Sequence, residues 1–125
     1  MTNETLETIK SRRSCRAYKP EQITDEELNA VLEAGTYAAS AMGRQSAKIV
    51  VVQDATTRAQ LTRMNAAVMG KDTDPMYGAP TILVVLADAH AANAVQDGSL
   101  VMGNLMLAAK KIIMTGDQYD AKSGK

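Results

Sequence analysis

The stretch ITDEELNAVLEAGTYAA, residues 23–39, carries the clearest structural signal of this 125-residue chain. Thr24 followed by Glu27 forms a capping box, in which each side chain accepts a hydrogen bond from the other residue's backbone N–H. Behind this start, apolar or small residues recur at spacings of three and four: Leu28, Val31, Leu32 and Gly35. The pattern predicts an amphipathic helix over residues 25–38, with its apolar face turned toward the core.

The segments around this helix predict further helices and strands. A capped apolar spacing indicates a short helix over residues 3–11. A later helix begins at a cap formed by Thr56 or Thr57 and ends at Gly70, because glycine adopts the left-handed conformation that closes many helices. Two short apolar runs predict buried strands, over residues 48–54 and 81–88.

The last predicted element is a long helix over residues 90–112. Its apolar side chains lie around the whole circumference: Val95, Leu100, Met102, Leu105, Met106, Leu107 and Ile112. Such a helix is buried in a core or in an oligomer interface. A helix of about 30 Å is hard to bury fully within one subunit of this size, so the pattern favours a homodimer. One domain is expected over 1–112, followed by a polar tail over 113–125.

Composition excludes several classes of protein. Fourteen basic and fourteen acidic residues cancel, so the net charge indicates no nucleic-acid partner and no anionic membrane surface. One cysteine and one histidine allow no internal disulfide and too few ligands for an all-protein zinc site, so no metal is expected. Neither a run of about 18 apolar residues nor a signal-peptide pattern is present, which predicts a cytoplasmic α/β or α+β protein outside the membrane.

Familiar nucleotide-binding motifs are absent. The sequence GKDT at 70–73 lacks the P-loop's first glycine and its final hydroxyl, and no GxGxxG follows either predicted strand. Asp72 and Asp74 are interpreted as turn formers. His90 is a candidate cap for the next helix, and Cys15 is either a thiol activated by neighbouring arginines or a small half-buried residue.

The segment RRSCR, residues 12–16 (the arginine segment), is a candidate anion site. Arg12, Arg13, Ser14 and Arg16 offer guanidinium groups and a hydroxyl, the donors that bind phosphate with paired hydrogen bonds. A solvated basic face without a ligand is the alternative. A second candidate is AASAMGRQSAK, residues 38–48 (the small-residue loop), whose small side chains let a flat ring or a partner backbone approach closely.

Five separated segments, taken in order, resemble the FMN-dependent nitroreductase family. IKSRRSCRAYKP matches the family's R-R-S-x-R opening, and ITDEELNAVLEAGTYAAS matches its helix of the type EELxxVLEAGxxAPS. KIVVVQD, YGAPTILVVLAD and DGSLVMGNLMLAA follow in the family's order. The resemblance spans residues 5–109 and is specific because the segments agree together.

The resemblance implies an α+β nitroreductase-like fold, with a central mixed or antiparallel sheet flanked by helices. It also implies a homodimer with FMN at each end of the interface. The R-R-S-x-R residues would hold the flavin phosphate and ribityl chain: Arg12, Arg13, Ser14 and Arg16. The loop of the partner subunit would line the flavin with the following residues: Ala39, Ser40, Ala41, Gly43 and Gln45.

The resemblance further implies an oxidoreductase with a ping-pong reaction. NAD(P)H would pass hydride to the flavin and leave before a nitroaromatic, a quinone or a similar small acceptor enters. A nicotinamide that stacks on the flavin needs no Rossmann domain, which agrees with the missing GxGxxG. Because the flavin carries the chemistry, no catalytic side chain is expected.

The chain departs from the family pattern in two places. Ala39 stands where the family has Pro, Gly43 where it has Asn, and Ser46 and Ala47 where it has Pro-Trp. Beyond residue 109 the match ends, so a C-terminally shortened or rearranged member is expected. Two alternatives stay open: a non-enzymatic dimeric remnant of the same fold with weak or no flavin binding, and a small anion- or nucleotide-binding module that uses only the arginine segment.

Overall fold

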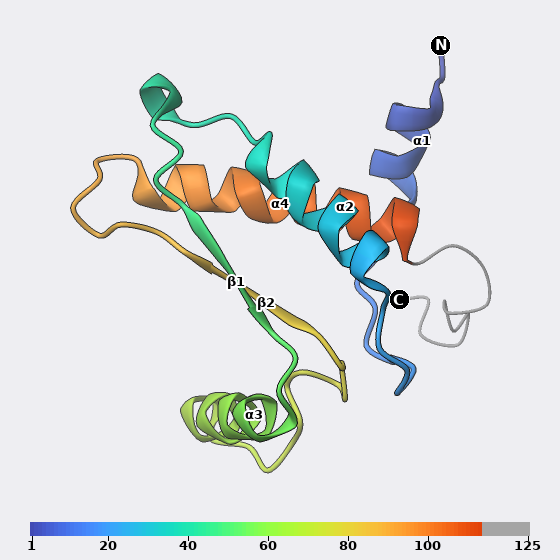
Figure 1. Cartoon of the computed structure of the whole chain (residues 1–125), viewed down its shortest axis with the longest axis vertical. Coiled ribbons are helices and arrows are strands. Elements are labelled where there is room, and N and C mark those ends of the chain that lie inside the picture. Colours follow the sequence, from blue (N-terminus) through green and yellow to red (C-terminus); the bar gives the residue numbers. More distant parts are fainter. Residues whose placement is uncertain (114–125) are drawn as a thin grey trace.

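The computed structural model describes residues 1–113 and has an α+β fold, as the sequence predicts (Figure 1). Helices flank a small antiparallel sheet. In chain order the elements are α1 (Glu4–Ser11), α2 (Asp25–Thr36), the 3₁₀ turn η1 (Ala41–Gly43), β1 (Lys48–Val52), α3 (Ala55–Met69), β2 (Ile82–Leu86) and α4 (Ala94–Ile112).

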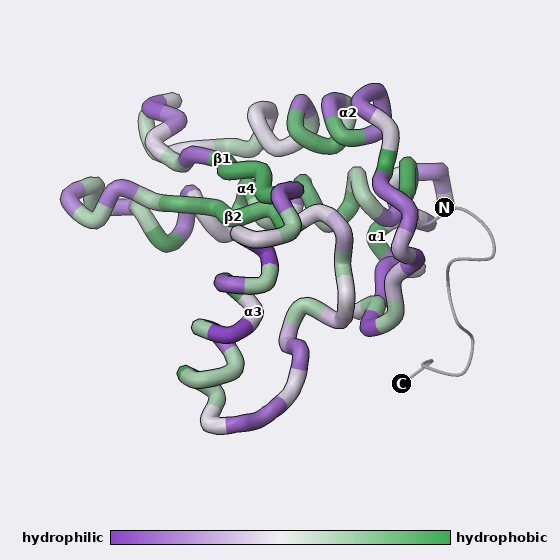
Figure 2. Tube along the Cα trace, turned by 60° about the horizontal axis from the view of Figure 1, so that its bottom comes forward, coloured by the Kyte–Doolittle hydropathy of each residue, from purple (hydrophilic) through white to green (hydrophobic). Residues whose placement is uncertain are grey.

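The sheet of the described part consists of β1 and β2, which pair antiparallel with Lys48 opposite Leu86 and Val52 opposite Ile82. Both strands fall inside the predicted ranges and are shorter by a few residues, but none of their residues is fully buried, contrary to the prediction. In Figure 2 they form a hydrophobic pair, and α3, which connects them, projects away from α2 and α4. No residue of α3 is buried.

The core lies where α2 packs on α4 and on the sheet. Leu28 and Val31 of α2 and Leu105 of α4 are its buried apolar side chains within residues 1–113. Gly35 lets these elements pack closely, because a Cβ built there would lie 2.8 Å from atoms of both Ile49 and Leu105. The apolar face predicted for the helix after Thr24 is therefore the face that packs.

The helix ends follow local capping chemistry. The capping box of Thr24 and Glu27 is confirmed, and α2 ends at Thr36, two residues before the predicted end. Gly70 closes α3 in the left-handed conformation (φ 63°), as predicted. The predicted start of α3 is wrong by two or three positions: Asp54, not Thr56 or Thr57, is the N-cap and accepts a hydrogen bond from the Thr57 N–H.

Helix α4 begins later than predicted, at Ala94, and His90 does not cap it. Asn93 occupies the N-cap position without a side-chain bond, and the His90 backbone N–H donates to Asp88 in a preceding turn. Much of the α4 apolar surface faces outward, with Val95 76% and Met106 44% exposed. No helix among the described residues is long and apolar enough to cross a membrane. The predicted tail, apart from Ile113, lies outside the described residues.

Candidate functional site

The arginine segment leads from the end of α1 toward α2 without regular secondary structure. Arg12 is half-buried and has extended backbone angles (φ −60°, ψ 131°) at the C-cap of α1, whereas Arg13, Ser14 and Arg16 are exposed. The Arg13 Nη1 donates to the carbonyl of Lys10 at 2.7 Å and to that of Arg12 at 2.9 Å. Arg13 therefore braces the end of α1.

No carboxylate within residues 1–113 forms a salt bridge with the arginine segment. The salt bridge of this part of the chain joins Lys111 to Glu4, and the hydrogen bond from Lys111 lowers the pKa of Glu4 below its ordinary value. The guanidinium groups of Arg12 and Arg16 thus have no anionic partner among the described side chains. Such a segment can bind an external anion without first breaking an internal ion pair.

Local contacts order the end of the arginine segment. The Tyr18 hydroxyl donates to the Cys15 carbonyl at 3.2 Å, and the Cys15 thiol donates to the Ala17 carbonyl at 3.0 Å. Burial raises the pKa of Tyr18, and the nearby Cys15 and Tyr77 add to this effect. The half-buried Cys15 fits the structural role more closely than the role of an activated thiol.

The small-residue loop is held in an unusual backbone conformation. Met42 (φ 54°), Gly43 (φ 66°) and Gln45 (φ 47°) all have positive φ, a region that side-chain-bearing residues rarely adopt. Two hydrogen bonds close the loop: the Gln45 N–H donates to the Ser40 Oγ, and the Gln45 Nε2 donates to the Thr36 carbonyl, each at 3.0 Å. The loop therefore has a defined shape at the end of α2.

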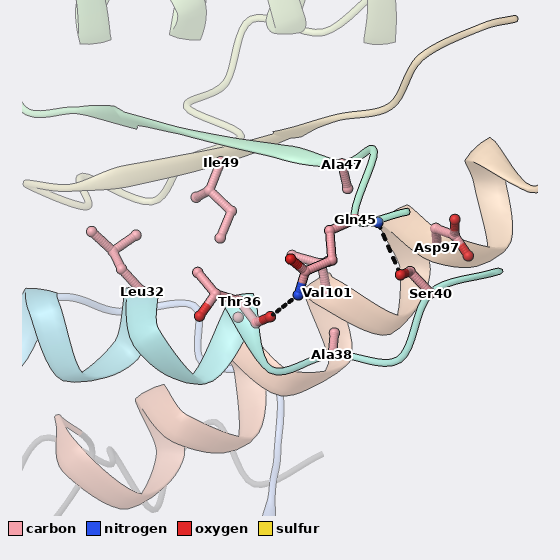
Figure 3. Close-up of a pocket in the computed structure, with 10 residues that line it drawn as sticks. Leu32, Thr36, Ala38, Ser40, Gln45, Ala47, Ile49, Asp97 and Val101 are labelled. Carbon is pink, nitrogen blue, oxygen red and sulfur yellow. Dashed lines mark hydrogen bonds between the residues drawn. The ribbon is translucent and has the colours of Figure 1, made fainter. Parts of the chain in front are cut away.

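A cavity of about 360 Å³ lies beneath this loop, between α2, β1 and α4 (Figure 3). Among the residues predicted to line a flavin, Ser40 and Gln45 border the cavity, whereas Ala39, Ala41 and Gly43 do not. At its α4 side lies Asp97, which is 5% exposed and accepts a hydrogen bond from the Ala41 N–H at 2.9 Å.

Sequence reasoning missed Asp97. The signal that could have found it is a carboxylate in the first turn of a helix that is otherwise apolar on most sides. An acidic residue in a first turn is also explained by the helix dipole, so this signal is ambiguous without the tertiary structure. Within residues 1–113 no group of three metal-ligating side chains comes together.

The two predicted groups of site residues lie at opposite ends of α2 (Figure 1). The arginine segment is near the start of α2, and the small-residue loop follows its end. The cavity beneath the loop contains none of Arg12, Arg13, Ser14 or Arg16. One copy of the described chain therefore does not bring the two groups together.

Comparisons with known proteins agree with this architecture. Residues 9–112 match the family model described as Nitroreductase family. The chain is 35% identical, over 112 residues, to an Archaeoglobus fulgidus protein named "Putative NADH dehydrogenase/NAD(P)H nitroreductase", covering 86% of this chain and 62% of the relative. A crystal structure of a Bacteroides fragilis nitroreductase with bound FMN is 34% identical with a TM-score of 0.78, covering 88% of this chain and 66% of that one.

A second structure, a Desulfitobacterium hafniense nitroreductase with bound FMN, is 32% identical with a TM-score of 0.78, covering 87% of this chain and 65% of that one. The chain thus spans slightly less than two thirds of the length of these relatives. Because the family match extends over most of the sequence and the solved structures share its fold, this chain belongs to the nitroreductase family.

Proposed function

We propose that this chain binds FMN and serves as an NAD(P)H-dependent oxidoreductase that reduces a small acceptor such as a nitroaromatic compound or a quinone. The observation that carries the proposal is the arginine segment, which no carboxylate among residues 1–113 neutralises, in a chain whose relatives include nitroreductases with bound FMN. These relatives also include one named as an NAD(P)H nitroreductase.

The residues present fit the two chemical parts of FMN. Arg12, Arg16 and the Ser14 hydroxyl are donors suited to a phosphate and to ribityl hydroxyls. The small-residue loop suits a planar ring: most of its side chains are short, and a Cβ added at Gly43 would meet no atom within 4 Å. FMN, when bound, supplies hydride acceptance and electron delivery, and the protein residues bind and orient it.

A complete site of this kind needs a second copy of the chain. The arginine segment and the small-residue loop are separated by the length of α2, so the loop that covers one flavin would come from the partner subunit (Figure 1). In this arrangement Ala39, Ser40, Ala41, Gly43 and Gln45 line the ring that the other copy holds by its phosphate. The outward apolar surface of α4 is the part of the described chain best suited to pair the copies.

One feature favours a second candidate, a dimeric remnant that binds flavin weakly or not at all. Gly43 occupies the position where the family pattern has Asn, so position 43 has no side-chain amide that could hydrogen-bond to the ring, and the Gln45 amide nitrogen already donates to the Thr36 carbonyl. The loss of one such bond weakens affinity by about 1 kcal/mol, which is less than the contribution of two guanidinium–phosphate contacts.

Purification without added cofactor tests the proposal. We expect yellow protein with the visible absorption bands of flavin, and consumption of NADH or NADPH when a nitroaromatic or quinone is added. Exchange of both Arg12 and Arg16 for Ala removes two charged donors, so the Kd for FMN should rise at least about 100-fold.

The matched control is Arg63→Ala, since Arg63 is an exposed arginine on α3, away from both predicted groups. This control should bind FMN as the parent protein does. Protein that remains colourless after incubation with FMN would refute the proposed function and favour the remnant. Phosphate-bearing ligands that bind with no preference for flavin would instead favour a simple anion-binding module.

A further inference from the structure

Asp97 carries a buried carboxylate. Within residues 1–113 it is the one charged or polar residue that is buried. Removing a carboxylate from water is costly unless hydrogen bonds compensate. The compensating contact comes from the Ala41 N–H, 56 positions earlier in the chain, whose nitrogen lies 2.9 Å from the Asp97 Oδ1. This contact joins the first turn of α4 to the middle of the small-residue loop.

The loop needs such an external contact because its backbone is strained. Positive φ angles at Met42 and Gln45 are unfavourable for residues with side chains, and they persist only where the surrounding structure holds them. The other hydrogen bonds of residues 38–45 stay within the loop or reach the end of α2. Among the hydrogen bonds of the described residues, only that of Asp97 fixes the loop to α4.

Helix α4 makes a second, similar contact on the same face. The Asn104 Nδ2 donates to the Ala34 carbonyl at 2.9 Å, and Asn104 lies seven residues, or about two turns, after Asp97. Asn104 fixes α4 to α2, whereas Asp97 fixes α4 to the loop. The exposed Met102 and Met106 lie on the other side of the helix, where we propose that a second copy pairs.

From these contacts we infer that Asp97 is a positioning residue for the cofactor: it holds the small-residue loop at the place from which the loop covers the flavin of the partner subunit. The inference rests on the proposed function, because it assigns a task to the loop. One helix then carries both the pairing surface and the anchor of the loop, so pairing of the copies sets where each loop meets the opposite site.

Asp97→Ala tests the anchor directly. Removing the acceptor should free the Ala41 N–H, so its hydrogen exchange in flavin-free protein should accelerate at least about tenfold. The Kd for FMN should rise by at least about tenfold, which corresponds to about 1.4 kcal/mol. Asp97→Asn keeps a carbonyl oxygen of the same shape and should restore most of the protection and most of the affinity.

Asn104→Ala is the matched control. This substitution removes the hydrogen bond from Asn104 to the Ala34 carbonyl, which has the same length as the Asp97 bond and comes from the same face of α4. That bond holds α4 to α2 and does not involve the loop. The variant's unfolding midpoint should fall, while the exchange of the Ala41 N–H and the Kd for FMN should change less than about twofold. A loss of affinity equal to that of Asp97→Ala would show that any weakening of α4 packing suffices, and would overturn the inference.

Ala41→Pro breaks the same bond from the other side. Proline suits the first residue of η1, and Ser40 before it is already extended (φ −140°, ψ 152°), as a residue preceding proline must be. The variant keeps Asp97 but removes the N–H that it binds. The Kd for FMN should rise as in Asp97→Ala, and the double variant should be no worse than Ala41→Pro alone, because both changes remove one interaction.

Failure of the inference and failure of the proposed function are distinguishable. Unchanged exchange of the Ala41 N–H in Asp97→Ala would overturn the inference whether or not the protein binds FMN. Faster exchange with an unchanged Kd would also overturn it, since the position of the loop would then not matter to the cofactor. Parent protein with no affinity for FMN would refute the proposed function and the cofactor role of Asp97 together, while the exchange experiment would still show whether Asp97 anchors the loop.

Discussion

Gly35 shows how one residue sets the spacing of three elements. It lies in α2 where Ile49 of β1 and Leu105 of α4 pack against it, and any side chain there would meet both. Its place on the apolar face was predictable from the spacing of residues 28–35. The contact itself was not predictable, since it depends on how the sheet and α4 pack against that face.

Gly35→Ala should destabilise the protein by about 1 kcal/mol. The new Cβ would lie 2.8 Å from the Ile49 Cδ1 and the Leu105 Cδ2. Ile49 borders the cavity beneath the loop and has space to move, but Leu105 is 3% exposed and has none. Overpacking typically costs about 1–3 kcal/mol, which exceeds the gain of about 1 kcal/mol in helix propensity.

Urea unfolding measures this change through the midpoint. Gly103→Ala is the control, because a Cβ at Gly103 would have no atom within 4 Å in the same chain, so this substitution should stabilise α4 by about 0.5–1 kcal/mol. If Gly35→Ala stabilised the protein as much as Gly103→Ala, the prediction that α2 packs closely at Gly35 would be refuted.

At the scale of elements, the caps decide where helices begin, and α3 depends strongly on its cap. None of its residues is buried, so little tertiary packing supports it. Asp54 accepts hydrogen bonds from the Thr57 N–H at 2.7 Å and from the Thr57 hydroxyl at 2.8 Å. Both bonds hold the pKa of Asp54 below its ordinary value of 3.8, and the bond from the backbone N–H has the larger effect.

Stability should therefore decrease in acid through Asp54. A carboxyl whose pKa is lower in the folded state contributes stability above its unfolded pKa, near 3.8, and loses that contribution as the pH falls through the lower folded value. Asp54→Asn keeps a good N-cap but cannot titrate, so its urea midpoint should differ less between about pH 6 and about pH 3 than that of the parent protein.

Asp54→Ala supplies the comparison for this pH effect. It should lower the midpoint already at about pH 6, because alanine cannot cap the helix. If the urea midpoint of Asp54→Asn fell in acid as much as that of the parent protein, Asp54 would contribute nothing to the pH dependence.

At the scale of the whole molecule, the described chain leaves much apolar surface uncovered. Its buried apolar side chains are few, whereas Val95, Met102 and Met106 of α4 are exposed along one groove with β2. Both strands also have an outer edge that no strand of residues 1–113 pairs with. An uncovered face of this kind is typical of an interface between subunits.

Met102→Glu combined with Met106→Glu should separate the proposed dimer. Charges buried without partners in an interface are costly, so the dimer Kd should rise at least about 100-fold. Sedimentation velocity should find two copies for the parent protein and one for the variant. Met64→Glu, on the exposed face of α3, is the control and should remain dimeric. A parent protein of one copy would contradict the prediction, as would a double variant that stays paired.

The sequence by itself determined the kinds of elements, their order and the family. Capping boxes, a C-cap glycine and β-branched runs act through neighbours in the chain, so α2, the end of α3 and both strands were predictable to within a few residues. Caps with competing candidates were less predictable: Asp54, not Thr56 or Thr57, caps α3, because its carboxylate accepts from both the N–H and the hydroxyl of Thr57 and so starts the helix earlier.

Only the tertiary structure decided which residues meet. The arginine segment and the small-residue loop belong to one proposed site in the family pattern, yet α2 keeps them apart within a single copy. Asp97 and Ala41 are 56 positions apart and carry no local pattern that links them, but packing of α4 on α2 joins them by a hydrogen bond. Contacts between distant segments depend on how helix faces pack, and that arrangement arises only when the whole chain folds.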